Sequence, residues 1–106
     1  MPSISVLYDH NIEGTGELQD KILEFVDEVI VGEFGAELLA SEKIERGNIA
    51  FDFKVEGYVI NGKVVTYSDY IDITLRVPFI VVIYKNKIIK LLDEHIPNYF
   101  GEQRWE

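Results

Sequence analysis

The sequence predicts an α+β fold. We expect an antiparallel β-meander of about four strands plus a short N-terminal strand, with one long amphipathic helix and a short C-terminal helix packed on one face. Apolar and polar residues alternate from residue 49 to 57 and again from 65 to 77, as in strands with one buried face. Between residues 17 and 32 the apolar residues recur every three or four positions, which indicates a helix.

The first strand and the long helix are predicted from the N-terminal third. Ser3 to Tyr8 is a short β-rich run, and the turn-forming residues Asp9 to Asn11 end it. Thr15 is the expected N-cap of the helix, which ends near Gly32. Residues 33–46 fit either a second short helix or an irregular connection with one helical turn. The apolar face of the long helix holds Leu18, Ile22, Phe25, Val26, Val29 and Ile30.

The sheet is expected to contain one tight hairpin turn and one irregularity. Asn61-Gly62 supplies a two-residue type I′ turn, because both residues tolerate positive φ. Asp69 falls at an inward position of the returning strand, where an unpaired charge is costly. A bulge or turn at residues 68–70 would relieve that cost.

Two more strands are predicted in the C-terminal third. Pro78 has no amide hydrogen, so it begins a strand or lies at an edge. The apolar run from Phe79 to Tyr84 is typical of a strand covered on both faces. Lys85-Asn86 is interpreted as a tight turn, residues 87–91 as the returning strand and residues 92–95 as a short helix. The expected core packs Leu18, Ile22, Phe25, Val26 and Val29 against Phe51, Phe53, Ile71, Ile73, Val81 and Ile83.

The C-terminal segment also resembles part of the thioredoxin-like fold. Val77 to Ile89 is similar to that family's segment of a proline, a strand, a tight turn and a strand, and Ser3 to Phe25 is similar to its first strand and helix. The resemblance implies a redox-dead scaffold, because Asp9-His-Asn-Ile12 lies near the place of the family's redox cysteine pair. A long hairpin also stands where the family has its second helix.

Length and composition limit the class of protein. We expect the 106 residues to form a single α+β domain, with residues 98–106 as a candidate mobile tail. The absence of cysteine excludes disulfides and thiolate chemistry and favours a cytoplasmic protein. No apolar run approaches the roughly 20 residues of a membrane span, and no leader peptide is visible. Richness in Ile, Val, Glu and Lys leans towards a thermophilic source.

Most of the net charge of −9 lies in residues 1–47, the half in which the long helix is predicted. Residues 1–47 carry eleven acids and three bases, a balance of −8, whereas residues 48–106 carry eight acids and seven bases, a balance of −1. Such acidity argues against direct binding to nucleic-acid phosphates. It fits a solvated helix face, a basic protein partner, or a DNA mimic that blocks a nucleic-acid-binding protein.

Two histidines define a candidate metal site. His10 and Glu13 lie between a strand end and a helix start, where ligand groups often sit. His95 ends the C-terminal helix. If the two regions meet, His10, Glu13 and His95 would form a carboxylate–histidine set suited to a divalent metal. The alternative is an ordinary solvated turn and helix end, with no cofactor.

Aromatic side chains supply a candidate interaction surface. Tyr58 and Tyr70 fall on the polar faces of predicted strands, and Tyr99, Phe100 and Trp105 lie in the C-terminal tail. Such residues are enriched at interfaces, and the tail is expected to dock on this chain or on a second copy. The sequence holds no nucleophile motif or phosphate loop. The leading prediction is therefore a small non-enzymatic protein-interaction module that forms a homodimer and binds neither nucleic acid nor a membrane.

Overall fold

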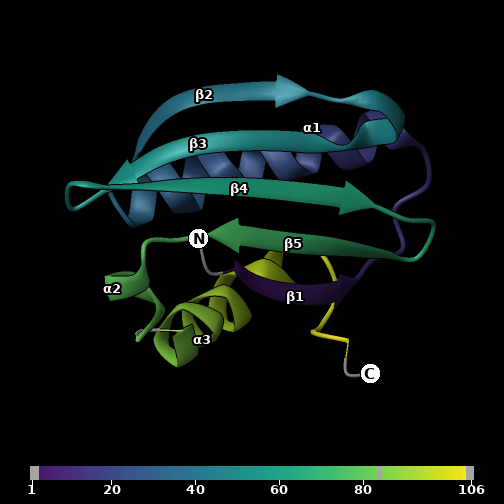
Figure 1. The fold of residues 1–106 in the computed structure, drawn as a ribbon. Coiled ribbons are helices and arrows are strands. Elements are labelled where there is room, and N and C mark those ends of the chain that lie inside the picture. The colour runs from purple at the N-terminus through teal and green to yellow at the C-terminus, as the bar shows by residue number, and fades with distance from the viewer. Residues whose placement is uncertain (1–2, 84, 105–106) are drawn as a thin grey trace.

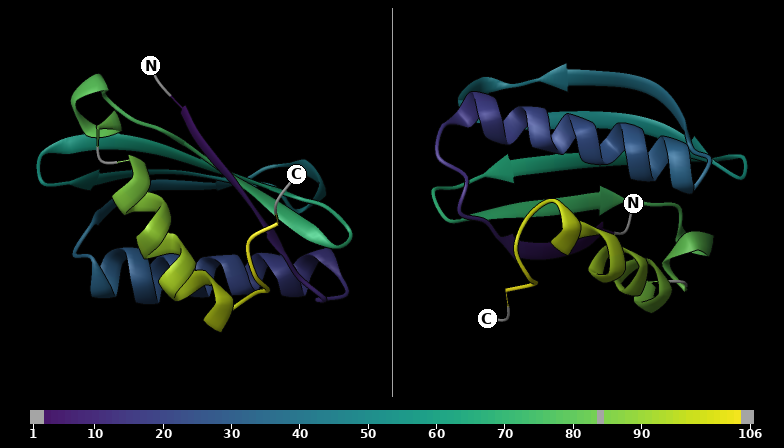
Figure 2. Two further views of the ribbon diagram at one scale, coloured as in Figure 1. Left: turned by 90° about the horizontal axis from the view of Figure 1, so that it is seen from below. Right: turned by 180° about the vertical axis from the view of Figure 1, so that it is seen from behind.

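The computed structural model describes residues 3–83 and 85–104, with the backbone alone at residues 46 and 82 (Figure 1). Within these residues, five strands form one antiparallel sheet in the order β1-β5-β4-β3-β2. The strands are β1 (Ser3–Asp9), β2 (Glu37–Lys43), β3 (Ile49–Val55), β4 (Tyr58–Thr66) and β5 (Tyr70–Arg76). The predicted α+β class is confirmed, because a long helix and a shorter C-terminal helix cover one face of this sheet (Figure 2).

The long helix consists of α1 (Thr15–Phe25) and η1 (Val26–Glu33), a wider π-helical continuation. It ends one residue beyond the predicted Gly32. The helix begins at Thr15 itself, with Gly14 at the cap position and no side-chain cap hydrogen bond, so the prediction of Thr15 as N-cap is wrong. The predicted apolar face is confirmed, because five of its side chains are buried: Leu18, Ile22, Phe25, Val26 and Val29.

Residues 33–46 contain a strand in place of the predicted helix or irregular connection. β2 pairs with β3 at the edge of the sheet, with a register shift between Leu38 and Ala40. The glutamates, leucines and alanine of this segment favour a helix intrinsically, but pairing with β3 outweighs that preference. All seven residues of β2 are exposed, so no buried face left an alternating pattern in the sequence.

The hairpin turn between β3 and β4 lies earlier than predicted. Glu56 and Gly57 make this turn with φ of 50° and 85°, as a type I′ turn requires. Asn61-Gly62 lies inside β4 instead. The buried positions are odd-numbered in β3 and even-numbered in β4, and this change of parity is the mark of an intervening two-residue turn.

The turn predicted around Asp69 is confirmed. β4 ends at Thr66 and β5 begins at Tyr70, so Asp69 lies outside the sheet and is exposed. Its carbonyl oxygen accepts a hydrogen bond of 2.9 Å from the His10 amide. The turn therefore joins this end of the sheet to the loop that follows β1.

The C-terminal third is helical, and the strands predicted there are wrong. After Pro78 the chain forms α2 (Phe79–Val82), α3 (Lys85–His95) and η3 (Ile96–Asn98); η2 (Glu45–Gly47) is a separate short turn before β3. Buried or half-buried Ile88, Leu92 and Ile96 recur every four residues, which is a helical period. Tyr84 lies outside the described residues. The segment that resembled thioredoxin-like proteins thus lacks the strand–turn–strand form on which that resemblance depended.

The core lies between the sheet and the helices. The predicted sheet contribution is confirmed for Phe51, Phe53, Ile71 and Ile73, which are buried. Val81 is half-buried, and Ile83 is wrong as a core residue, because it is 73% exposed. The largest side chains that are fully buried are those of Tyr8, Ile4, Ile22, Ile49, Ile71, Ile96 and Val77.

In the part of the chain that the structure describes, no helix packs along the other face of the sheet (Figure 2), and polar side chains bond to one another there. Ser5 on β1 donates a hydrogen bond of 3.0 Å to Asp72 on β5, and Asn61 on β4 donates one to Asp52 on β3. Among the described residues, no helix is both long enough and apolar enough to cross a membrane.

Candidate functional site

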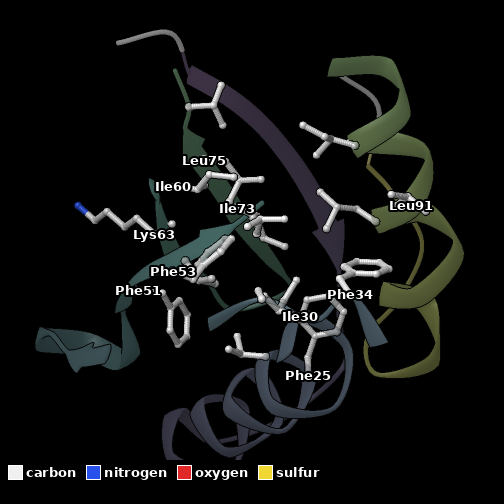
Figure 3. A pocket seen from close by; sticks show the side chains of 18 of the residues that line it. Phe25, Ile30, Phe34, Phe51, Phe53, Ile60, Lys63, Ile73, Leu75 and Leu91 are labelled. Atoms are coloured by element: carbon white, nitrogen blue, oxygen red, sulfur yellow. The ribbon is translucent and has the colours of Figure 1, made fainter. Parts of the chain in front are cut away.

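An apolar cavity of about 370 Å³ separates part of the sheet from the helices. Figure 3 shows side chains converging on it from three directions. The long helix contributes Phe25 and Ile30, and Phe34 follows directly after it. The sheet contributes Phe51, Phe53, Ile60, Ile73 and Leu75, and α3 contributes Leu91. Protein interiors contain few voids larger than a water molecule, so a space of this volume is unusual in a domain of this size.

The wall of the cavity is almost entirely hydrocarbon. Its charged members are Glu56, Lys63 and Lys87, all of them exposed, and they place the mouth beside the β3–β4 hairpin and the start of α3. The amino group of Lys63 points away from the apolar side chains (Figure 3). In the described part of the chain, no buried side-chain nitrogen or oxygen lacks a hydrogen-bond partner. The interior of the cavity therefore offers apolar contact and no unpaired polar side chain.

Gly62 lies in the wall of the cavity. It occupies an inward position of β4, opposite Phe51 on β3 and Leu75 on β5. Its φ lies outside the left-handed region, and a Cβ atom there would meet its nearest neighbours, Leu75 and Phe53, at 3.4 Å. Neither the backbone conformation nor crowding therefore requires glycine. Glycine inside a strand weakens it and often marks a place where a ligand or another backbone approaches closely.

A cavity of this size is costly if it stays empty. An unoccupied wall of this kind leaves apolar side chains facing water, and each Å² of apolar area that an occupant covers contributes about 25 cal/mol. Domains are stable by only about 5–15 kcal/mol in total. An occupant of matching chemistry would add to that stability.

An exposed apolar surface borders the cavity. Phe79, Ile80 and Ile83 are 78%, 57% and 73% exposed, while Val81, between them in sequence, lines the cavity. We call Phe79, Ile80 and Ile83 the α2 surface. Clusters of large exposed apolar side chains mark interaction sites more often than single ones do. Sequence reasoning missed this surface because an uninterrupted apolar run predicts a strand covered on both faces.

His10 is fully engaged within the protein. The residue is 8% exposed, and its Nδ1 accepts a hydrogen bond of 3.1 Å from the Ile12 amide. Its Nε2 lies 2.8 Å from the carbonyl oxygen of Tyr67 and must therefore carry the proton and donate. Both ring nitrogens of His10 are thus occupied in joining the loop after β1 to the β4–β5 turn.

His95 and Glu13 do not join His10 in a metal site. The His95 ring packs edge-on against Phe34, with ring centroids 5.2 Å apart, and Glu13 is exposed. Across residues 3–83 and 85–104, no three His, Asp or Glu side chains are placed where they could hold one metal ion. The geometry gives the predicted metal site no support.

Two of the five aromatic residues predicted to form an interaction surface, Tyr70 and Tyr99, pack against rings within the chain. Tyr70 stacks on Tyr67 with centroids 4.4 Å apart, and the Arg104 guanidinium lies 4.4 Å from its ring centre. Tyr99 packs edge-on against Phe25, and its hydroxyl donates a hydrogen bond of 2.7 Å to Glu28. The other residues of the set are Phe100, half-buried in the cavity wall, Tyr58, which is 40% exposed near the mouth, and Trp105, outside the described residues.

The C-terminal tail docks along β1. The Asp9 amide donates to the Glu102 carbonyl over 2.9 Å, and the Arg104 amide donates to the Leu7 carbonyl over 2.8 Å. The Arg104 side chain binds Asp69 over 3.1 Å and also binds Asp9. These carboxylates, Asp69 first, raise the pKa of Arg104 above its ordinary value. The tail therefore covers the β1 edge of the sheet, and β2 forms the opposite edge.

Tyr8 fastens β1 to α3. Its side chain is fully buried, and its hydroxyl donates a hydrogen bond of 2.6 Å to Asp93. Burial, and then the bond to Asp93, raise the pKa of the Tyr8 hydroxyl well above its ordinary value. The Gln103 side-chain amide faces the same carboxylate. This contact holds α3 in position as one wall of the cavity.

We compared the chain with known protein families, curated proteins and solved structures. No family model, curated protein or solved structure matches the chain. What the protein binds must therefore be argued from its own cavity, surfaces and charges.

Proposed function

We propose that the protein is a small non-enzymatic interaction module that self-associates through the α2 surface. The observation that carries this proposal is the simultaneous exposure of Phe79, Ile80 and Ile83 on one short element. Burying apolar area stabilises a complex by about 25 cal/mol per Å². A twofold axis beside α2 would bring the same apolar patch of two copies together, so the surface complements itself.

The distribution of charge supports association at α2. Two copies that met through the outward face of α1 would bring their acidic side chains together and repel. Figure 1 shows α2 beside β5 and away from α1, and the view from behind in Figure 2 agrees. The α2 surface itself is uncharged and is followed by Lys85 and Lys87. Contact there brings fewer like charges together.

The sheet edges are less suitable interfaces. The tail covers the last part of β1, from Leu7 to Asp9, and β2 combines a register shift with the charged residues Glu37, Glu42 and Lys43. Charges and irregularities on an edge strand discourage pairing with another strand. We therefore place the interface at α2 rather than at a sheet edge or at the aromatic residues that the sequence suggested.

Sedimentation velocity at micromolar concentration tests the proposal. Wild-type protein is expected to sediment as a dimer, and a variant with Phe79→Ser and Ile83→Ser as a monomer. A matched control replaces Leu39 and Val59 by serine, since these residues are 49% and 45% exposed and lie on other elements. The control should remain a dimer. A monomeric wild type, or a dimer that only the control weakens, would overturn the proposal.

A further inference from the structure

We infer that the cavity between the sheet and the helices is a binding site for a small, uncharged, apolar molecule. This function goes beyond self-association and depends on different residues. The cavity volume of about 370 Å³ lies within the range of about 300–1,000 Å³ that is usual for ligand pockets. Side chains from the long helix, α2, α3 and three strands form its wall (Figure 3), so a ligand would lie within the fold rather than on its surface.

The wall specifies the chemistry of the ligand. Phenylalanine, isoleucine, leucine and valine side chains make up nearly all of it. A polar ligand group would lose its hydrogen bonds to water without finding replacements, which disfavours its entry. The ligand is therefore hydrocarbon over most of its surface, and any polar end stays at the mouth.

The mouth offers a charged ligand no net electrostatic attraction. Glu56 and Lys87 contribute opposite charges there, and the amino group of Lys63 points away from the cavity (Figure 3). Anionic ligands such as fatty carboxylates are normally held by a net positive site, commonly one built on arginine or lysine. Because these two charges cancel, the site favours an uncharged molecule.

Gly62 provides the independent evidence that the space is kept open. The neighbouring inward positions of β4 carry the large side chains of Ile60 and Val64, and both are buried. A Cβ atom at position 62 of the central strand would contact Leu75 and Phe53 at 3.4 Å, and a longer side chain there would compete with these two residues for the space of the cavity. The sequence thus has its smallest residue where a larger one would fill the site. A glycine inside a strand also makes the strand less stable.

A pair of fluorescent probes with the same aromatic body tests this inference. N-phenyl-naphthylamine is neutral, and anilinonaphthalene sulfonate adds one negative charge; both brighten in apolar surroundings. We expect wild-type protein to bind the neutral probe saturably and the sulfonate at least about tenfold more weakly, because the cavity offers the charged group no partner. Equal or tighter binding of the sulfonate would overturn the assignment of an uncharged ligand.

The location is tested by filling the cavity. Gly62→Leu should weaken binding of the neutral probe by about tenfold or more, since the leucine would occupy space that the probe needs. Ala50→Leu adds the same side chain to the polar face of β3, where Ala50 lies opposite Lys63, and should leave binding unchanged. If Gly62→Leu fails to fold, the smaller substitution Gly62→Ala replaces it in the test. Gly62→Ala should also weaken binding of the neutral probe, but by less. Unchanged binding in the folded position-62 variant would overturn the inference.

Self-association and ligand binding are separable in this design. The variant with Phe79→Ser and Ile83→Ser should lose the dimer and still bind the neutral probe. Gly62→Leu should lose the probe and remain a dimer. Loss of probe binding in the α2 variant would instead place the probe on the α2 surface and overturn the cavity as its site.

Discussion

Tyr8 is the residue on which the position of α3 most depends. Its ring is fully buried in β1, and its hydroxyl reaches Asp93 across the layer boundary. Tyr8→Phe keeps the ring and removes a hydrogen bond to a charged group, so we expect a loss of about 1.5–3 kcal/mol of unfolding free energy. Urea denaturation measures it. Tyr58→Phe, at an exposed position, should change stability by less than about 0.5 kcal/mol; equal losses in both variants would contradict the role given to Tyr8.

Tyr99 predicts how stability depends on alkaline pH. Its hydrogen bond to Glu28, followed by burial, raises its pKa from 10.0 to about 12. Below pH 10 the phenol is protonated in both states and the bond contributes fully. Between pH 10 and about 12 the unfolded chain loses the proton first, so the free energy of unfolding falls as pH rises. Tyr99→Phe should reduce that slope in urea titrations from about pH 9 to pH 11.5, although Tyr8 adds a slope of the same sign. An unchanged slope would contradict the assignment.

Gly62 shows the limit of residue-level prediction. Asn-Gly is the strongest local signal for a type I′ turn, yet Glu56-Gly57 makes the turn here. The buried apolar positions are odd-numbered before Glu56-Gly57 and even-numbered after it, and this change indicates the correct place of the turn. Local turn propensity and strand periodicity conflicted at this point, and periodicity, which reflects burial of a whole strand face, determined the fold.

At the scale of elements, amphipathic segments were predictable and segments without a clear period were not. The long helix and β3 each bury one face, and burial selects a period that the sequence displays. β2 buries nothing, and only its pairing with β3 makes it a strand. α3 has a helical period that a long preceding apolar run obscured. The cavity was unpredictable for the same reason, because α3 forms one of its walls.

The docked tail makes a prediction of its own. Arg104 holds the tail through Asp9, Asp69 and the face of Tyr70. Arg104→Ala removes all of these contacts, so the amides of Asp9 and residue 104, which are bonded between tail and β1, should exchange with solvent faster. Hydrogen exchange followed by NMR measures both. The amide of Ile60 in β4 serves as the control, and a uniform acceleration that includes it would indicate global destabilisation instead.

At the scale of the whole molecule, charge opposes the association proposed for α2. Each copy carries −9, so two copies repel although their contact surfaces are uncharged. Salt shortens the screening length from about 30 Å at 0.01 M to about 3 Å at 1 M. The dimer should therefore become tighter with rising salt in sedimentation equilibrium. Weakening with salt would indicate an interface held by ion pairs and would contradict the apolar α2 contact.

The helices divide the surface of the molecule into an acidic part and an apolar part. α1 and η1 carry the acidic outer surface, whereas α2 and α3 carry the apolar surface and one wall of the cavity. The long helix and α3 lie on the same face of the sheet (Figure 2), and the cavity lies between them and the sheet. A change in the position of α3 would alter the cavity without disturbing the sheet.

The pairing of β1 with β5 has a consequence for the time course of folding. Ser3 pairs with Arg76 and Asp9 with Tyr70. The partner of β1 thus lies more than 60 residues away along the sequence. β3, β4 and β5 are joined by short turns and meet early, because closing a short loop is fast and distant pairing is slow. We expect the meander to form first and β1 to join it last. Pulse-labelled hydrogen exchange during refolding should protect Phe53 before Val6, and the reverse order would contradict this sequence of events. Until β1 docks, α3 lacks the hydrogen bond from Tyr8 to Asp93 that fastens it to the sheet.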